Sequence, residues 1–263
     1  MPEPILFEPL SYQLSDNGVA FISIDVKDRP VNVLTPELHE AIGTVADHLA
    51  SDDDAIGAVL HSGKSSFMAG GDLKRIVRFY DRNRTAAEAY EQSRAYTESL
   101  RKLETCGKPV AVAINGTALG GGLELALACD LRVAGENARL GLPEAGLGLV
   151  PGAGGTQRLP RICGEAAARR LILGAEVVDG TEAARLGLVQ WVVPDDQLAD
   201  WTQTLVARLG SLPGPALAAC KSCIAASFDG SPGGYDRELQ VTRELHGLAE
   251  TQRRIQAFLE RAS

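Results

Sequence analysis

Two glycine-rich segments are the parts of the chain in which backbone groups could do chemistry. Residues 67–72 (Phe-Met-Ala-Gly-Gly-Asp) follow a predicted strand, and residues 115–124 (Asn-Gly-Thr-Ala-Leu-Gly-Gly-Gly-Leu-Glu) lead from another strand into a predicted helix. Glycine lets backbone N–H groups approach a ligand closely, and N–H groups at a helix start are unpaired and favour negative charge. Two such donors could form an oxyanion hole, in which each stabilises developing charge by about 2.7–4 kcal/mol. Tight turns and close helix–strand packing are the alternative explanation for these glycines.

Two glutamates close to these segments could supply acid–base chemistry. Glu124 comes three residues after Gly121, and helical spacing places its side chain near the face that carries the N–H donor. Glu144 lies among apolar residues and glycines in residues 141–150, where burial would raise the pKa of its carboxyl group and keep it protonated, as a general acid requires. On local sequence alone either glutamate could equally be structural, because an acid in the first turn of a helix gains about 0.3–1 kcal/mol from the helix dipole.

The elements that must position these residues follow from hydrophobic periodicity and turn signals. Strands are predicted at residues 19–26, 56–61 and 109–115, the last nearly all apolar and so covered on both faces, with short ones at 131–134 and 189–193. Helices are predicted at residues 35–50 (capped by Thr35 before Pro36), 73–105, 123–129, 165–173, 181–186, 196–209, 213–227 and 235–261. Because strand signals stop at about residue 195, we predict an α/β domain over residues 1–195 and a helical region over residues 196–263.

Composition argues against several classes of protein. The chain has 26 Lys and Arg against 34 Asp and Glu, a net charge of −8, so a nucleic-acid partner has no long-range electrostatic support. No apolar run reaches the roughly 18 residues of a membrane span, and the N-terminal residues do not have the pattern of a signal peptide. The odd count of five cysteines indicates a reducing compartment. We therefore expect a cytoplasmic protein with no membrane or nucleic-acid partner.

Three further patterns carry little weight. Gly63-Lys64-Ser65 resembles the end of a Walker A motif, but the residues before it are predicted to form a strand and no helix is predicted to follow. Cys220 and Cys223 have the spacing of a redox or zinc pair, but they lie in a predicted helix without a second pair and are expected to be structural thiols. The four histidines are scattered, so no metal site is expected.

Three motifs, in order and at compatible spacings, resemble the crotonase (enoyl-CoA hydratase/isomerase) superfamily: residues 67–72, residues 115–126 and residues 142–159. The resemblance extends over nearly the whole chain, including residues 29–34 (Arg-Pro-Val-Asn-Val-Leu) and residues 178–189. It implies an α/β fold with a crotonase-like ββα superhelix core and a helical C-terminal trimerisation region. Family members commonly form trimers or dimers of trimers, so residues 196–263 are the expected oligomerisation region.

The resemblance also implies roles for individual residues. The backbone N–H groups of Gly71 and Gly121 would hold the thioester oxygen; Gly71 stands where alanine is common in the family, a change that keeps the backbone donor. Glu124 would activate water for attack at C3, Glu144 would deliver the proton to C2, and Gly152 would help to position the water.

Other residues are implied to bind the coenzyme A part of the substrate. The adenine end would lie near Ala69 and Gly70, with Lys27 or Arg29 as phosphate partners. The remaining expected contacts are Val31, Asp72, Leu73, Gly120 and Pro143. Coenzyme A belongs to the substrate, so no cofactor and no metal is expected.

The predicted function is hydration of a 2-enoyl-CoA to a 3-hydroxyacyl-CoA, in fatty-acid or related acyl-CoA metabolism. Because several isomerases of the superfamily retain only the acid that matches Glu144, the presence of both glutamates favours a hydratase. Double-bond isomerisation or another acyl-CoA reaction of the superfamily is the alternative, and a non-catalytic, RNA-associated role is opposed by the acidic balance. Residues 73–104 would shape the acyl pocket but contain no recognisable pattern, so the length of the acyl chain stays open.

Overall fold

The computed structural model describes residues 3–262 apart from residue 76, residues 78–84 and residues 229–232. The chain divides into two compact units, residues 1–211 and residues 212–263. This division lies one helix later than the boundary that we predicted at residue 195. The physical reason is that helix α7 (Leu198–Gly210) buries apolar side chains, Leu205 and Val206 among them, against the strands of the first unit.

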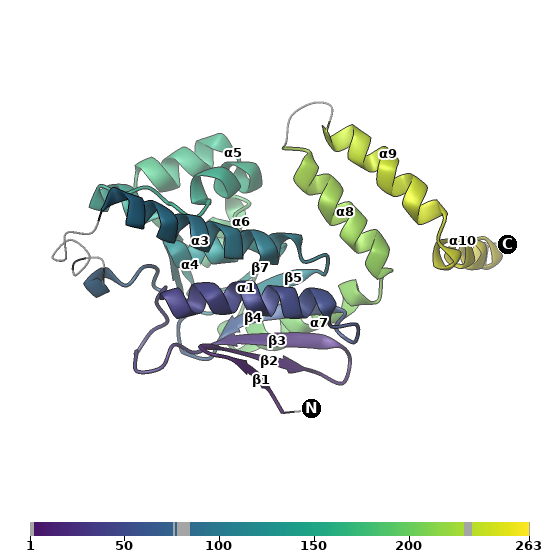
Figure 1. Cartoon of the computed structure of the whole chain (residues 1–263), viewed down its shortest axis with the longest axis horizontal. Coiled ribbons are helices and arrows are strands. Elements are labelled where there is room, and N and C mark those ends of the chain that lie inside the picture. Colours follow the sequence, from purple (N-terminus) through teal and green to yellow (C-terminus); the bar gives the residue numbers. More distant parts are fainter. Residues whose placement is uncertain (1–2, 76, 78–84, 229–232, 263) are drawn as a thin grey trace. The chain divides into compact units, whose positions relative to one another are not determined.

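A seven-stranded sheet forms the centre of the first unit, in the order β1-β2-β3-β4-β5-β7-β10. Its strands from β1 to β7 are labelled in Figure 1. The first three strands pair antiparallel, and every pair from β3 to β10 is parallel. The strands are β1 (Ile5–Phe7), β2 (Leu10–Leu14), β3 (Val19–Ile24), β4 (Gly57–Ser62), β5 (Val110–Ile114), β7 (Leu131–Gly135) and β10 (Trp191–Val193).

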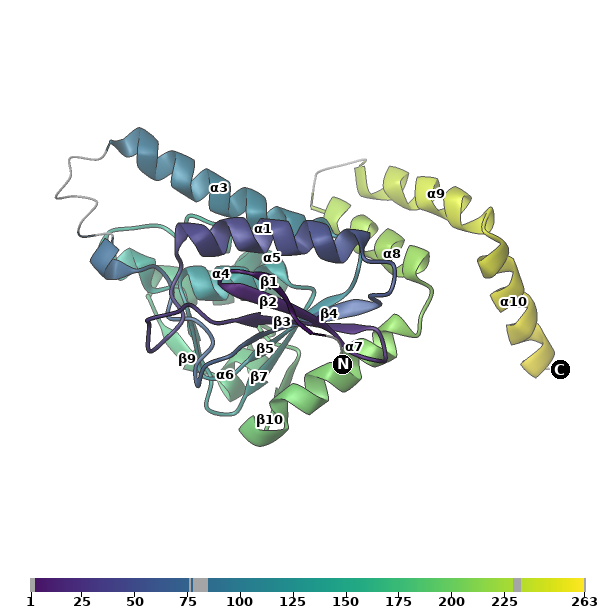
Figure 2. The same ribbon diagram turned by 60° about the horizontal axis from the view of Figure 1, so that its bottom comes forward.

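Helices cover both faces of this sheet. Helices α1 (Pro36–Ser51) and α3 (Ala86–Thr105) lie side by side over one face, and α7 lies on the opposite face (Figure 2). Strand β5 is buried along its whole length, with Val112 and Ile114 in the core of the first face and Ala111 in the cluster that contains α7. The prediction that this strand is covered on both faces is therefore confirmed.

A second, three-stranded sheet positions the residues of chemical interest. Strand β6 (Thr117–Leu119) follows β5 and leads directly into α4 (Gly121–Ala128), and it pairs with β8 (Arg139–Gly141), which in turn pairs with β9 (Val177–Asp179). A short 3-10 helix, η1 (Pro143–Leu147), follows β8. The starts of α4 and η1, which carry Glu124 and Glu144, are thus attached to neighbouring strands of one small sheet.

Several elements differ from the sequence prediction. Helix α3 begins at Ala86, after a capping box of Thr85 and Glu88, and part of the predicted helix at 73–105 lies outside the described residues. Helix α5 (Gly155–Leu173) starts ten residues before the predicted position. A non-helical Gly164 with φ of 80° interrupts it, and the predicted helix corresponds to the part after this interruption. Strands β1, β2, β6, β8 and β9 were not predicted, whereas helix α6 (Gly180–Arg185) was.

The second unit contains three helices within the described residues: α8 (Gly214–Ala226), α9 (Gly233–His246) and α10 (Ala249–Ala262). We predicted one helix over residues 235–261, but the helix ends at His246 and a new one begins at Ala249. Gly247, which lies between them, is a residue type that weakens helices. Among the residues that the structure describes, no helix is long and apolar enough to span a membrane.

Candidate active site

Three segments that are distant in sequence are held together by backbone hydrogen bonds. Residues 67–70 bind the loop before α1 through Ala69 N, which donates to Asn32 O (2.9 Å), and through Gly70 O, which accepts from Leu34 N (2.8 Å). On the other side, Met68 N donates to Thr117 O at 2.7 Å, and Met68 O accepts from Leu119 N at 3.1 Å. The two glycine-rich segments therefore lie side by side, as their proposed joint role requires.

The buried side chain of Asn32 fixes one end of this arrangement. Its Nδ2 donates to the backbone oxygens of Ile24 (3.0 Å) and Phe67 (3.1 Å) and to Ser62 Oγ (2.9 Å), while its Oδ1 accepts from Val26 N at 2.9 Å. Sequence reasoning did not single out Asn32. The available signal was an amide side chain between two valines in a loop, which predicts burial with saturated hydrogen bonds.

The amides of Gly71 and Gly121 are free to bind a ligand. Among the backbone hydrogen bonds of the described residues, neither N–H group has an acceptor. The carbonyl of the same peptide group is fixed in both cases, because Gly70 O accepts from Leu34 N and Gly120 O accepts from Glu124 N at 2.9 Å. Gly121 is buried and Gly71 is half-buried, and an oxygen ligand would supply the acceptor that a buried N–H group requires.

Close packing explains part of the glycine pattern as well. A Cβ atom at Gly122 would lie 2.5 Å from Met68 O, and one at Gly121 would lie 2.9 Å from Leu34 Cδ2. The packing explanation and the chemical one therefore apply to the same segment.

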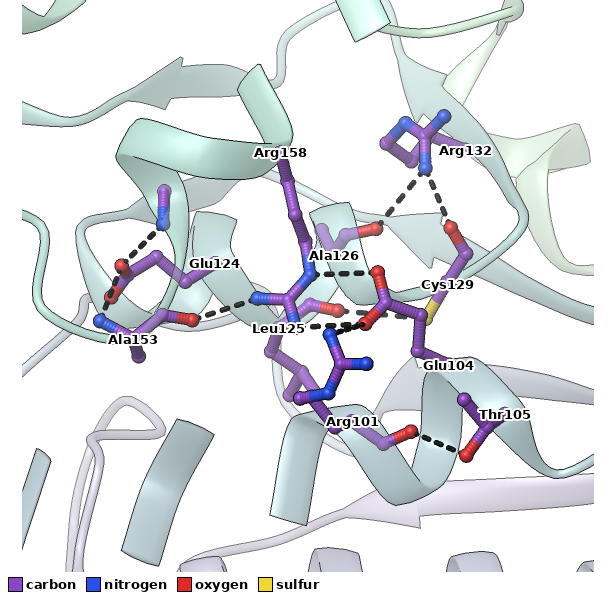
Figure 3. Close-up of polar contacts among 11 residues, drawn as sticks. Arg101, Glu104, Thr105, Glu124, Leu125, Ala126, Cys129, Arg132, Ala153 and Arg158 are labelled. Carbon is purple, nitrogen blue, oxygen red and sulfur yellow. Dashed lines mark hydrogen bonds and ion pairs between the residues drawn. The ribbon is translucent and has the colours of Figure 1, made fainter. Parts of the chain in front are cut away.

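The carboxyl group of Glu124 is held by a turn from another part of the chain. It is 3% exposed, and its Oε1 accepts from Ala153 N and Gly155 N, both at 2.8 Å (Figure 3). Burial raises the pKa of Glu124, while the two N–H donors and the positive charge of Arg158 act in the opposite direction. The two N–H donors therefore hold the carboxyl group in one orientation.

The carboxyl group of Glu144 has a different environment. Burial raises the pKa of Glu144 to about 7, and the negative charge of Glu124 adds to this effect, so the two carboxyl groups interact. Its Oε2 is buried without a hydrogen-bond partner, and its Oε1 would lie 2.8 Å from a Cβ at Gly120. Glu144 therefore combines a raised pKa with a carboxyl oxygen that has no partner, beside the start of α4, and such groups are candidates for a functional site.

Gly152 lies in the turn between η1 and α5, next to α3. It is exposed, and Thr97 Oγ1 approaches its carbonyl at 3.4 Å, while a Cβ at this position would lie 3.4 Å from Ser93 Oγ. The nearby Ala153 and Gly155 donate to Glu124, so the structure places Gly152 in the turn that holds this side chain.

The expected phosphate partners of coenzyme A already have carboxylate partners. Arg29 Nη2 pairs with Asp72 Oδ2 at 2.7 Å, and Lys27 Nζ pairs with Glu8 Oε1 at 2.6 Å on the surface. Lys64, which we noted only within the Walker-like pattern, is also close: its Nζ donates to Arg29 O (2.9 Å) and pairs with Asp25 (2.7 Å). The structure thus places Lys64 against Arg29, which pairs with Asp72, whereas Lys27 pairs with Glu8 on the surface. Sequence reasoning noted Lys64 only within the Walker-like pattern.

The other predicted contacts surround the same loops. Ala69 and Leu73 are exposed, Val31 and Pro143 are half-buried, and Gly70 and Gly120 are buried. Within the described part of the chain, no group of three or more His, Cys, Asp or Glu residues could hold a metal ion. Cys220 and Cys223 are free thiols.

An α/β fold with two adjacent amide donors and two interacting carboxyl groups defines a class of enzymes that stabilise an oxyanion while moving protons. A sequence model of the family described as "Enoyl-CoA hydratase/isomerase" matches residues 15–263. The chain belongs to this family, and the predicted crotonase-like fold is confirmed.

Individual relatives agree with this assignment. The crotonyl-CoA hydratase of Syntrophomonas wolfei is 37% identical over 231 residues, which cover 86% of this chain and 84% of that protein. The crystal structure of an enoyl-CoA hydratase from Bacillus anthracis has a TM-score of 0.87 at 30% identity and covers 96% of each chain. The fatty acid oxidation complex subunit alpha of Idiomarina loihiensis is 42% identical over 191 residues, 72% of this chain. The match spans only 26% of that longer protein.

Proposed function

We propose that this protein hydrates 2-enoyl-CoA thioesters to 3-hydroxyacyl-CoA thioesters. The observation that carries the proposal is the pair of interacting glutamates in different environments, one held by two N–H donors and one with a pKa of about 7. Addition of water across a conjugated double bond needs one base and one acid, and these two environments supply them. Relatives described as crotonyl-CoA hydratase and short-chain-enoyl-CoA hydratase support the same substrate class.

The chemistry follows from the groups present. Glu124 takes a proton from water as the water oxygen bonds to C3 of the substrate. The electrons of the C2–C3 double bond move toward the thioester carbonyl, whose oxygen gains negative charge and is stabilised by the N–H groups of Gly71 and Gly121. Glu144 gives its proton to C2, so that one water molecule has been added. The proton on Glu124 then returns to Glu144 through solvent, which restores both groups.

The remaining parts of the substrate are assigned to the surrounding loops. The adenine end of coenzyme A lies near Ala69 and Gly70. Its phosphates bind Lys27 and Arg29 and replace the carboxylate groups that pair with these residues in the free protein. The further contacts are Val31, Asp72, Leu73, Gly120, Pro143 and Gly152. Because base, acid and oxyanion donors all come from the chain, the reaction requires neither a metal ion nor a redox cofactor.

The assembly and location are part of the same proposal. The protein forms a trimer or a dimer of trimers through its C-terminal helices and acts in the cytoplasm. The apolar side chains that the second unit exposes support such an interface, with Tyr235 77% and Phe258 72% exposed in the single chain.

The decisive experiment measures hydration and double-bond isomerisation side by side, with a panel of 2-enoyl-CoA and 3-enoyl-CoA esters of increasing length. Loss of absorbance of the conjugated thioester reports hydration. We expect Glu124→Gln and Glu144→Gln each to lower kcat for hydration by at least about 100-fold, with little change in binding of a saturated acyl-CoA. Full hydration by either variant would refute the proposal, and isomerisation that needs only Glu144 would establish the alternative reaction.

A further inference from the structure

An ion pair between the buried Arg158 and the half-buried Glu104 lies next to the turn that holds the proposed base, and it has no part in the mechanism above. Arg158, in the first turns of α5, is 6% exposed and grips Glu104 of α3 with two donors: Nε to Oε1 at 3.0 Å and Nη2 to Oε2 at 3.1 Å. Its third donor, Nη1, binds the carbonyl of Ala153 at 2.7 Å (Figure 3). One guanidinium therefore joins α3 to the turn that holds Glu124.

Arg158 fixes both peptide groups that flank Gly154. Its side chain binds Ala153 O, and its backbone N–H donates to Gly154 O at 2.8 Å. The N–H groups of this turn, on Ala153 and Gly155, are the two that bind Glu124. Gly154 has φ of 98°, and a Cβ there would overlap the guanidinium, so the turn and the arginine side chain are fitted to each other.

We propose that Arg158 is the positioning residue for the base Glu124, and that Glu104 sets how much of the positive charge of Arg158 acts on that carboxylate. This inference rests on the proposed function, because it assigns Glu124 as the base of that reaction. It goes beyond that function by assigning a role to the Glu104–Arg158 pair, which does not contact the substrate. The pair fixes the turn that binds Glu124 and sets the net charge that acts on its carboxylate.

The charged and titratable groups around Glu124 come from three elements. Arg158 of α5 lowers the pKa of Glu124, and Glu144 of η1 interacts with Glu124 as a second carboxyl group. The negative charge of Glu124 also contributes to raising the pKa of Tyr96 of α3. Burial raises the pKa of Tyr96 well above its ordinary value, so this residue is neutral. Arg158 is therefore the cation that opposes the cost of burying an ionised Glu124, and Glu104 is the anion that offsets that cation.

Variants of the two partners should move the titration of Glu124 in opposite directions. Arg158→Gln removes the positive charge and leaves Glu104 paired with Arg101 at 3.9 Å, so the pKa of Glu124 rises. Glu104→Gln leaves the cation without its partner, so the pKa of Glu124 falls. Arg158→Lys keeps the charge but loses the two-pronged geometry, so the titration stays close to wild type while the rate falls.

The experiment reads this titration in two ways. The first is the acidic limb of the pH profile of kcat/KM for crotonyl-CoA hydration. The second is the carboxyl carbon-13 signal of Glu124 in protein labelled on glutamate, assigned by its absence in Glu124→Gln. Arg169→Gln is the matched control, because Arg169 lies on the same helix but pairs with Glu165 on the surface.

We expect Arg158→Gln to lower kcat/KM by about 10- to 100-fold, as a displaced catalytic group would, and to shift both titrations to higher pH. Arg169→Gln should match wild type. The inference is overturned if Arg158→Gln and Glu104→Gln leave the signal of Glu124 in place or shift it in the same direction. A wild-type protein that hydrates no enoyl-CoA would defeat the proposed function instead, and the carbon-13 titration would still decide the role of Arg158.

Discussion

Glu124 and Glu144 are chemically identical side chains, but their surroundings favour different protonation states. Glu124 has both N–H donors and a cation, which favour its ionised form, whereas Glu144 Oε2 has neither. Burial acts on both, so the difference lies in what compensates it. The apolar neighbours of Glu144 in the sequence predicted the raised pKa, and the structure bears this out. The turn that holds Glu124 comes from residues 153–155 and was not foreseen.

The pH dependence of hydration follows from these two environments. Glu144 must be protonated to act, so kcat/KM for crotonyl-CoA should fall as the pH rises through about 7. Glu124 must be ionised, so the rate should also fall on the acidic side, at a pH above the ordinary pKa of a glutamate. Initial rates between about pH 5 and pH 9 will give a bell, whose two apparent values belong to the interacting pair. A flat profile would contradict the assignment.

The same raised pKa makes a prediction about stability. Because burial raises the pKa of Glu144 from its ordinary value of 4.5 to about 7, the folded state binds more protons than the unfolded state between these values. The free energy of unfolding therefore falls as the pH rises through this window. Glu144→Gln removes this cost, so its Tm should exceed that of wild type above pH 7, by roughly 2–4 °C if the partly exposed group contributes about 1 kcal/mol.

Scanning fluorimetry at several pH values will test this sign. The difference in Tm between Glu144→Gln and wild type should shrink toward acidic pH. There the wild-type carboxyl group is protonated, so neither protein buries a charge at this position. A variant that is less stable than wild type at alkaline pH would show that Glu144 makes favourable contacts as an anion. It would also remove the argument for a general acid.

At the scale of elements, the first turn of α4 must approach the segment before Gly71 more closely than any side chain permits. A Cβ at Gly122 would meet Met68 O, a backbone atom that cannot rotate away. Gly122→Ala should therefore push the two amide donors apart and lower kcat by about 100-fold or more, with a smaller effect on stability. Gly214→Ala is the control, because a Cβ there has open space. Steady-state kinetics decide, and an active Gly122→Ala would show that the donors tolerate displacement.

Elements with strong local signals were predictable from the sequence. Helix α1 begins after the capping Thr35, whose side chain accepts from Leu38 N, and β5 is apolar throughout and buried throughout. Both glycine-rich segments were found because glycine before a helix is a local pattern. Short strands such as β8 and β9 have three residues each and were missed, since three residues show no periodicity.

What the sequence could not predict depends on contacts between distant residues. Asn32 reaches Phe67 across 35 positions, and Arg158 reaches Glu104 across 54. Each of these polar side chains would suit the surface when taken alone. Only the packing of α3 and α5 against α4 turns Arg158 from an ordinary charged residue into a buried support of the base.

At the scale of the whole molecule, the two units differ in how they bury apolar side chains. The first unit has two continuous hydrophobic clusters, one on each side of its sheet. In the second unit, Val241 is the one described residue of its helices that is buried, while Leu239 is 71% and Phe258 72% exposed. A unit of this size with so little interior gains little stability alone, and exposed apolar faces of this kind indicate association.

The last prediction concerns this association. If α9 and α10 pack against other copies of the chain, a charge at Leu239 or Phe258 must be desolvated in the interface and should dissociate the assembly. Light scattering after size exclusion should give three or six times the chain mass for wild type and a smaller mass for Leu239→Glu and Phe258→Glu. Gln256→Glu adds the same charge on α10 without removing an apolar contact, so it should keep the wild-type mass. A wild-type monomer would mean that these faces bind something other than another copy. Dissociation with hydration retained would separate the assembly from the chemistry.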